Sequence, residues 1–379
     1  MLRAAIAFCL TLLCIVFPAV GQTVADNTSL ANALKNAMPG SVIKLQSGTY
    51  RGGVFADLQG TKDKPIVIEA AGKEKPIIEG GTSGLQISKA KYVTVRNLRL
   101  RGAAGNGINI DDGKTVDHSS VGVVLEGLEV EDVGPVGNCD GIKLSGLKEF
   151  VVRDCIVTGW GGNGIDLVGC RDGVIERCTL TGKEGFNPAT GPQIKGGSSN
   201  VIIRNCRFDR AGQRAVNIGG STGLEFFRPL DAPFEAKDIT VENNVFMGSE
   251  AAAAFVGVDG AVFRHNTIID PGKWVFRILQ ESRDARFTRC RNVNVERNLI
   301  VYRRAAVRTA VNIGPETLPA TFAFKENWWW CSDSPTTRPD LPTEEQRGVF
   351  GQDPKLSSDA DWPTPQNAIA KSHGAKGTK

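Results

Sequence analysis

Short apolar runs alternate with polar residues at a regular spacing along most of the chain. Eight segments share one pattern, in which a short β-branched run is followed by a charged residue, then Asn, Cys or Gly, then a second apolar pair. These segments are VTVRNLRL, VVLEGLEV, FVVRDCIV, GVIERCTL, VIIRNCRF, ITVENNVF, AVFRHNTI and VNVERNLI. Alternation with a period of two is typical of a strand with one buried face.

The eight segments form an internal repeat of roughly 20–40 residues. A second short strand follows most copies, with the sequences GINI, GIKL, GIDL, PQIK, AVNI, VFRI and AVNI. Such units are too short for helical crossovers and have no hairpin register. They predict an all-β fold, a parallel β-helix in which each coil hydrogen-bonds to the coils beside it.

The position shared by the eight copies predicts an inward-facing slot. Asn side chains there can form a ladder of amide hydrogen bonds between coils, and Cys side chains can fill the same place as small apolar groups. We interpret these cysteines and the neighbouring His265 as structural, because no Cys-x-x-Cys or His pair accompanies them. The slot residues are Asn97, Gly127, Cys155, Cys178, Cys206, Asn244, Asn266 and Asn298.

The two ends of the repeat array differ from its centre. An amphipathic segment with Leu30, Ala33 and Leu34 is followed by Pro39-Gly40, which predicts a short helix that caps the first coil. Regular coils end near Asn327, where Pro, Ser and Thr become frequent. We therefore divide the chain into a signal peptide (1–21), a β-helix domain (22–335) and a tail (336–379) that partly covers the last coil and ends disordered.

Composition limits the function classes. An apolar run at 2–17, followed by small Ala19 and Gly21, predicts a cleaved signal peptide and a secreted or periplasmic protein with no membrane span after its removal. The net charge of +4, without a polybasic tail, does not suggest nucleic acid as a partner. Seven of the nine cysteines follow the signal peptide, and an odd number argues against a fully paired disulfide framework.

Several stretches resemble the right-handed β-helix polysaccharide lyases, the group that holds calcium-dependent pectate lyases, chondroitinase B and alginate lyases. The stretches are LANALKNAMPGSVIKLQSGTYRG, GTKDKPIVIEA and the coils after them, and the resemblance covers about residues 28–330. It implies a right-handed helix and a lysine or arginine base on the outer face of one sheet, with calcium held by nearby acids.

Two motifs indicate which residues of this chain match the functional residues of that group. DGIKLSG is similar to the NGFKLGG-type strand that holds the base lysine of one pectate lyase family, and the matching residue is Lys143. PQIKGGSSN and AGQRAVNIGG are similar to the lysine and arginine segments of the chondroitinase B group, matching Lys195 and Arg214. The carboxylates that this group places before its lysine have no counterpart in NPATGPQIK.

The repeat register gives an independent reading of the same strands. The residue between the two apolar positions of each second strand points outward, and Asn109, Lys143 and Asp166 should stand on three successive coils with Asp111 beside them. An ordinary polar outer face, with Lys143 and Asp166 as a surface ion pair, remains the alternative. The outward residues are Asn109, Lys143, Asp166, Gln193, Asn217, Arg277 and Asn312.

This strip could perform β-elimination on a uronate polymer. A calcium ion on the sugar carboxylate would stabilise the developing negative charge and lower the pKa of Lys143, so that this lysine acts as the base. Lys195 or Arg214 would bind a sugar carboxylate or assist the departing oxygen. The candidate calcium ligands are Asp111, Asp112, Asp140 and Asp166, and the candidate substrate contacts are Asn109, Trp160 (by stacking), Asn163, Asn217 and Arg277.

We therefore expect a monomeric, exported lyase that binds and cleaves an acidic polysaccharide with calcium. Two alternatives stay open. The first is a β-helix glycoside hydrolase that uses two carboxylates such as Asp140 and Asp166. The second is a carbohydrate-binding surface protein without catalysis, and the sequence does not identify the polymer in any of the three cases.

Overall fold

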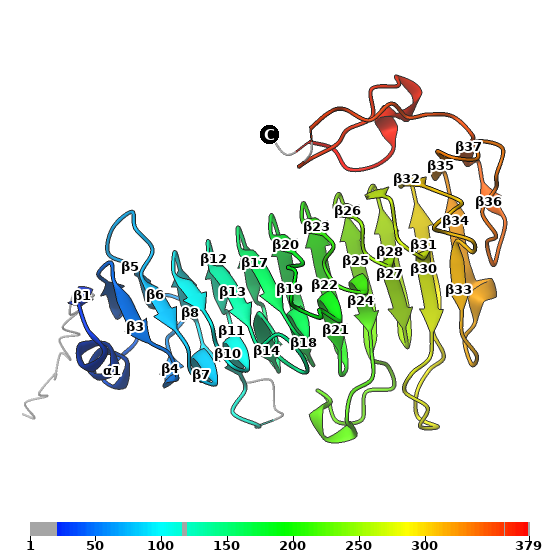
Figure 1. Cartoon of the computed structure of the whole chain (residues 1–379). Helices are drawn as coiled ribbons and strands as arrows, with labels where there is room; N and C mark the ends of the chain where they lie inside the picture. Colours follow the sequence, from blue (N-terminus) through cyan, green and yellow to red (C-terminus); the bar gives the residue numbers. More distant parts are fainter. Residues whose placement is uncertain (1–20, 116–119, 360, 378–379) are drawn as a thin grey trace, which may run out of the picture.

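The structure is a computed structural model that describes residues 21–115, 120–359 and 361–377. The predicted signal peptide therefore lies outside the described residues, except for Gly21. The described chain winds into a rod of stacked coils, with its N-terminal helix at one end and a folded-back tail at the other (Figure 1). Within the described part of the chain, no helix is long and apolar enough to cross a membrane.

Three lines of parallel strands run along the rod. The first line, which we call the site sheet, contains β4 (Val54–Gln59), β7 (Ser83–Lys91), β10 (Asn106–Asp111), β14 (Ile142–Ser145), β18 (Asn163–Val168), β21 (Thr190–Lys195), β24 (Arg214–Gly219), β27 (Ala251–Val256), β30 (Trp274–Leu279) and β33 (Val311–Ile313). The second line contains β1 (Gly21–Val24), β2 (Val42–Leu45), β5 (Ile66–Ala70), β8 (Val93–Arg96), β12 (Val124–Glu126), β16 (Val151–Arg153), β19 (Arg171–Glu176), β22 (Ser198–Arg204), β25 (Ala236–Glu242), β28 (Val258–Arg264), β31 (Arg291–Glu296), β34 (Phe322–Lys325) and β36 (Glu345–Gln346). The short β11 (Ser120–Val121) and β15 (Leu147–Lys148) connect these two lines.

The third line forms a separate twelve-stranded sheet. Its strands are β3 (Thr49–Arg51), β6 (Ile77–Glu79), β9 (Arg99–Arg101), β13 (Glu129–Val133), β17 (Ile156–Trp160), β20 (Thr179–Thr181), β23 (Arg207–Asp209), β26 (Val245–Met247), β29 (Thr267–Ile269), β32 (Leu299–Tyr302), β35 (Trp328–Cys331) and β37 (Val349–Phe350). Each coil thus contributes up to three strands, and the all-β parallel β-helix predicted from the repeat is confirmed.

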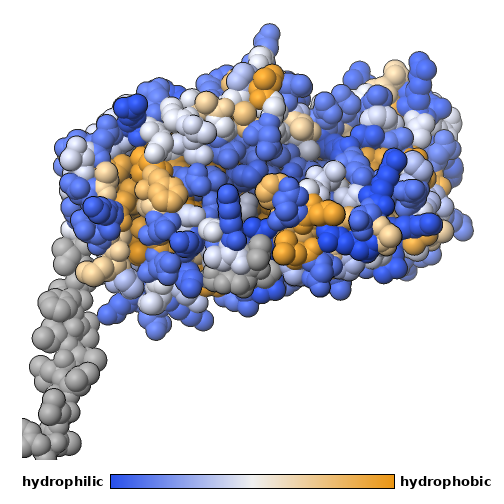
Figure 2. Space-filling view, turned by 90° about the horizontal axis from the view of Figure 1, so that it is seen from below, coloured by the Kyte–Doolittle hydropathy of each residue, from blue (hydrophilic) through white to orange (hydrophobic). Residues whose placement is uncertain are grey.

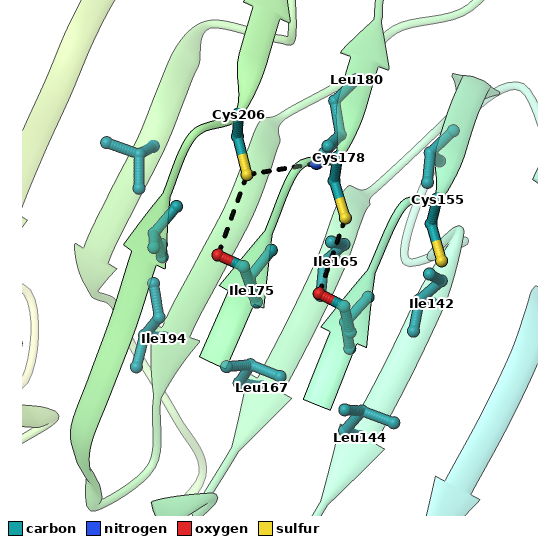
Figure 3. Packing of buried hydrophobic residues seen from close by; sticks show 14 of the residues in the cluster. Ile142, Leu144, Cys155, Ile165, Leu167, Ile175, Cys178, Leu180, Ile194 and Cys206 are labelled. Carbon is teal, nitrogen blue, oxygen red and sulfur yellow. Dashed lines mark hydrogen bonds between the residues drawn. The ribbon is translucent and has the colours of Figure 1, made fainter. Parts of the chain in front are cut away.

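The inward slot is confirmed, with a one-residue correction at its start. Cys155, Cys178 and Cys206 are buried on successive coils and pack among Ile and Leu side chains (Figure 3). The predicted slot residues Asn97 and Gly127 instead lie at the bend one position earlier, with φ of 57° and 60°. Leu98 and Leu128 fill the slot on those coils.

An asparagine ladder continues the slot toward the C-terminal end. Asn266 Oδ1 accepts hydrogen bonds from the backbone N and the Nδ2 of Asn244, both at 3.0 Å. Asn298 accepts the same pair of hydrogen bonds from Asn266, and Asn327 accepts it from Asn298. Because all four side chains are fully buried, each amide satisfies backbone and side-chain donors that water cannot reach.

A helix covers the N-terminal end of the rod. The helix α1 (Asn27–Lys35) begins at a capping box between Asp26 and Ser29 and buries Leu30, Ala33 and Leu34, as predicted. Three short 3₁₀ helices, η1 (Leu224–Phe226), η2 (Pro319–Thr321) and η3 (Ile369–Ser372), lie in the loops and the tail.

The C-terminal tail differs from its prediction. It folds back along the third line of strands, where the backbone N of Gly374 donates to Arg297 O at 3.0 Å and that of Ala375 donates to Thr267 Oγ1 at 2.9 Å. Residues 371–377, which we expected to be disordered, are therefore held by several coils. The reason is that the tail pairs with loop and bend groups far back in the sequence, which composition alone does not reveal.

Replacing Asn266 with Ala should lower the free energy of unfolding by about 2–3 kcal/mol, because two buried donors of Asn244 lose their acceptor and Val241 O loses its donor. Urea unfolding of the variant and of the wild type measures this difference. Asn294→Ala, at an exposed position of β31, is the matched control and should change stability by less than about 0.5 kcal/mol. Equal losses in both variants would contradict the role of the ladder.

Candidate active site

Two buried carboxylates of the site sheet share one lysine. Lys143 on β14 donates to Asp140 Oδ2 and to Asp166 Oδ2, both at 2.8 Å. Asp166 lies directly beside Lys143 on the next coil, as predicted, and Asn109 lies beside it on the previous coil. The predicted register of Asn109, Lys143 and Asp166 is therefore present, but Asp166 is fully buried instead of open to solvent as we expected.

A second lysine completes this cluster. Lys195 Nζ lies 3.3 Å from Asp166 Oδ1 and donates to Gln193 Oε1 at 3.1 Å. The side chains of Asp140 and Asp166 are fully buried, whereas 20% of the Lys143 side chain and 15% of the Lys195 side chain are exposed. Two carboxylates thus lie beneath two lysine side chains, and only the lysine side chains are partly exposed.

The charges in the cluster shift its protonation equilibria. Burial by itself lowers the pKa of Lys143, but Asp166 and Asp140 raise this pKa by more, so that it lies above its ordinary value. The pKa of Asp140 is also raised, mainly by burial and then by Asp166, and Lys143 offsets part of this shift. Lys143 therefore carries its proton at neutral pH in the free protein.

A hydrogen-bond chain behind the cluster fixes Asp140. Its Oδ1 accepts from the backbone N and the Nδ2 of Asn163, both at 2.9 Å, and Asn163 Oδ1 accepts from Thr190 Oγ1 at 2.8 Å. Trp160 is fully buried and donates its indole N–H to Thr190 O at 2.8 Å. The expectation that this indole stacks on a sugar is wrong, because the ring packs under the coil. Asn163 is likewise 95% buried and supports Asp140 rather than facing a ligand.

Arg214 lies on the C-terminal side of the cluster. It donates to Asn217 Oδ1 at 3.1 Å and to Glu281 Oε1 at 2.8 Å. Asn217 is fully buried, so it cannot be the direct substrate contact that we expected. Glu281 comes from the loop after β30 and is 67 positions from Arg214 in the sequence. The repeat pattern therefore did not indicate this ion pair.

The four predicted calcium ligands do not form one group: Asp140 and Asp166 meet at Lys143, whereas Asp111 and Asp112 have other partners. Asp112 is almost fully buried and forms an ion pair with Arg228 at 2.7 Å, so its carboxylate holds a loop in place. Asp111 accepts from Gln86 Nε2 at 3.1 Å and from Ser88 Oγ at 2.5 Å. Asp111 belongs to a different row from Asp166, because it pairs in register with Ser145, two positions beyond Lys143.

The cluster itself does not fit calcium. In the described ranges, no group of three or more His, Cys, Asp or Glu side chains could hold a metal ion. Calcium takes six to eight oxygen ligands, whereas the Lys143 ammonium fills the space between Asp140 and Asp166. A lysine thus provides the positive charge where the resemblance implied a metal.

Arg277 lies farther along the same face. It occupies the outward position of β30, four strands from Asp166, where it donates to Asn312 Oδ1 at 3.1 Å. Its guanidinium carbon lies 4.5 Å from the centre of the Trp274 ring. Arg277 is therefore separate from the lysine cluster but belongs to the same outward face.

This arrangement suits the binding of anionic groups. A ligand that approaches the cluster meets Lys143 and Lys195 first, while the carboxylates below keep the lysines in place. Because the lysines cover the two carboxylates, the arrangement disfavours the glycoside hydrolase alternative. In that reaction a carboxylate has to reach the sugar as nucleophile or acid. Asp140 and Asp166 are covered by the lysines and do not reach the surface.

Comparison with known proteins supports the fold. Among solved structures, the chain is similar to an alginate lyase from Paenibacillus sp. str. FPU-7, with 21% identity, 78% of this chain and 96% of that chain covered, and a TM-score of 0.51. It is also similar to pectate lyase Pel9A, with 12% identity, coverages of 94% and 96%, and a TM-score of 0.54. A GH136 lacto-N-biosidase from Eubacterium ramulus gives 14% identity, coverages of 80% and 63%, and a TM-score of 0.50.

At these identities the likeness concerns the fold, which lyases and a lacto-N-biosidase share. No curated protein matches the sequence. The family model described as "Right handed beta helix region" matches residues 83–291, which is more than half of the chain. Together with the parallel coils described above, this match shows that the chain belongs to the right-handed β-helix family.

Proposed function

We propose that the protein is an exported, monomeric lyase that cleaves an acidic, uronate-containing polysaccharide by β-elimination. The observation that supports this proposal most is the pair of partly exposed lysines, Lys143 and Lys195, above two buried carboxylates. Acidic sugars present carboxylates to which such ammonium groups can bind. The fold shared with an alginate lyase and a pectate lyase is consistent with this chemistry.

Lys143 and Lys195 would have different roles in the reaction. Lys143 keeps its charge because two carboxylates contact it, so it suits the neutralisation of the sugar carboxylate and of the negative charge that develops there. Lys195 contacts one carboxylate, and in the molecules in which it has given its proton to the solvent its neutral amine would accept the carbon-bound proton next to the sugar carboxylate. This is a revision of the sequence-based roles, in which Lys143 was the base.

The remaining step is the departure of the glycosidic oxygen. As the proton leaves carbon, a carbon–carbon double bond forms, the bond to the glycosidic oxygen breaks, and this oxygen takes a proton from water. Arg214 lies on the next strand beyond Lys195, and its side chain is 17% exposed, as accessible as the two lysines, so it would hydrogen-bond to the departing oxygen. The product is an unsaturated uronate at the new non-reducing end.

The direct test is absorbance in the ultraviolet band of unsaturated uronates, measured with purified protein on pectate, alginate and glycosaminoglycans. A rise in absorbance on one of these polymers supports the lyase. Saturated fragments without a rise in absorbance would instead support the glycoside hydrolase. Retention on a polymer without any fragments would support a binding protein.

Lys143→Ala should reduce the rate of cleavage by about 10²–10⁴-fold, because the charge at the cluster is lost. The rate of product formation at saturating polymer measures this effect. Lys148→Ala is the control, because Lys148 lies on the same coil and forms an ion pair with the exposed Glu149 instead of with the cluster, and its rate should equal that of the wild type. A fully active Lys143→Ala variant would rule out the proposed role.

Removal of divalent cations should leave cleavage unchanged within about twofold, because Lys143 fills the space between the two carboxylates. The rate is measured after dialysis against a chelator and again after calcium is added back. A loss on dialysis that calcium restores would show that the lysine does not replace the metal.

Lys143→Met should make stability depend on pH between pH 4 and pH 8. Without the ammonium, the already raised pKa of Asp140 rises further, so the native state keeps a proton that the unfolded state releases. Stability then falls as the pH rises, and the loss relative to wild type should reach about 3–5 kcal/mol at pH 8. Urea midpoints at several pH values measure it.

The double variant Asp140→Asn with Lys143→Met is the control for this experiment. Its penalty at pH 8 should be smaller than that of Lys143→Met, because one buried charge is absent. A Lys143→Met penalty that is the same at pH 4 and pH 8 would contradict the electrostatic explanation.

A further inference from the structure

An open cavity of about 590 Å³ lies between the N-terminal helix and β4. Leu30 and Leu34 of α1 line one side, and Val54 and Phe55 of β4 line the other. Phe55 is 63% exposed, which is unusual for so large an apolar side chain. At this N-terminal end, apolar surface appears among hydrophilic side chains on the left of Figure 2.

The cavity and the lysine cluster lie on the same row of outward positions. Phe55 pairs in register with Gln86, Gln86 with Asn109, and Asn109 with Lys143. All four side chains are therefore in one outward row of the site sheet, and three strand spacings of about 4.8 Å place Phe55 about 14 Å from Lys143 along the rod. Gln86 and Asn109, which lie between them, are polar and partly exposed.

Two cations stand at the cavity. Lys35 and Arg51 line it and are both exposed, and the carboxylate in its lining, Asp57, is paired with Lys89 at 3.7 Å. Neither forms an ion pair with a carboxylate in the part of the chain that the structure describes, whereas most other arginines of the coils do. An aromatic ring beside two unpaired cations can bind a sugar whose apolar face meets the ring and whose carboxylate meets the cations.

We propose that this cavity is a remote subsite for one sugar of the acidic polysaccharide, in which Phe55 stacks on the ring and Arg51 and Lys35 bind its carboxylate. The inference rests on the proposed function, because it takes the same polymer as the ligand. The polymer would run along the outward row from the lysine cluster to the N-terminal cap. Only chains of several sugars would then reach Phe55.

The test compares two lengths of oligogalacturonate and of oligoalginate, a trimer and a decamer, on wild type, Phe55→Ala and Arg51→Gln. For the polymer that the wild type cleaves, both variants should raise the KM of the decamer by roughly three- to tenfold, the range expected for one stacking or exposed charge contact. The KM of the trimer and kcat should not change. Ile156→Ala, which removes an exposed apolar side chain from β17 on another sheet, is the control and should leave both lengths unaffected.

Retardation of each variant in gels that contain pectate or alginate separates the two proposals. Cleavage by the wild type with no length-dependent effect of Phe55→Ala would overturn the subsite and keep the lyase. Retardation that requires Phe55, without cleavage by any variant, would keep the subsite and overturn the lyase. A wild type that neither cleaves nor is retarded would overturn both.

Discussion

The parallel hydrogen bonding between successive coils is the constraint on which the rest of the structure depends. It places residues that are 20 to 40 positions apart beside each other, and it does so in fixed register, as Lys143 beside Asp166 shows. The bends must therefore have nearly the same shape in every coil. A residue with positive φ before each inward slot, such as Asn97 or His265, provides this shape.

The lysine cluster follows from the same constraint. Register puts Asp140, Lys143, Asp166 and Lys195 within hydrogen-bonding or ion-pair distance, and burial makes each charge depend on its partners. A polar outer face without function would leave such side chains exposed and weakly paired, as many arginine pairs of this rod are. The cluster differs because its carboxylates are fully buried and its ammonium groups are only partly covered.

The repeat was sufficient to predict the fold, because period-two alternation and recurrent bends occur in every coil. It also predicted the column of Asn109, Lys143 and Asp166, since that column requires only the register. The repeat could not predict how deeply a side chain is buried or which residue of a distant loop it contacts. Trp160 lies beneath the coil instead of above it, and Asp112 turns toward Arg228, a partner 116 positions away. The slot on two coils is filled by Leu98 and Leu128 and not by the predicted Asn97 and Gly127. The prediction was one position off because aligning the repeats by residue type does not distinguish neighbouring positions at a bend.

The folded-back tail has a further consequence for the rod. In a solenoid each coil contacts only its neighbours, so a terminal coil can open without disturbing those farther in. Residues 374–376 bond to Arg297, Thr267 and Asn243, which belong to three different coils. Opening of the C-terminal coils therefore requires the tail to detach first, and the last part of the rod behaves as one cooperative unit rather than as a series of independently fraying turns.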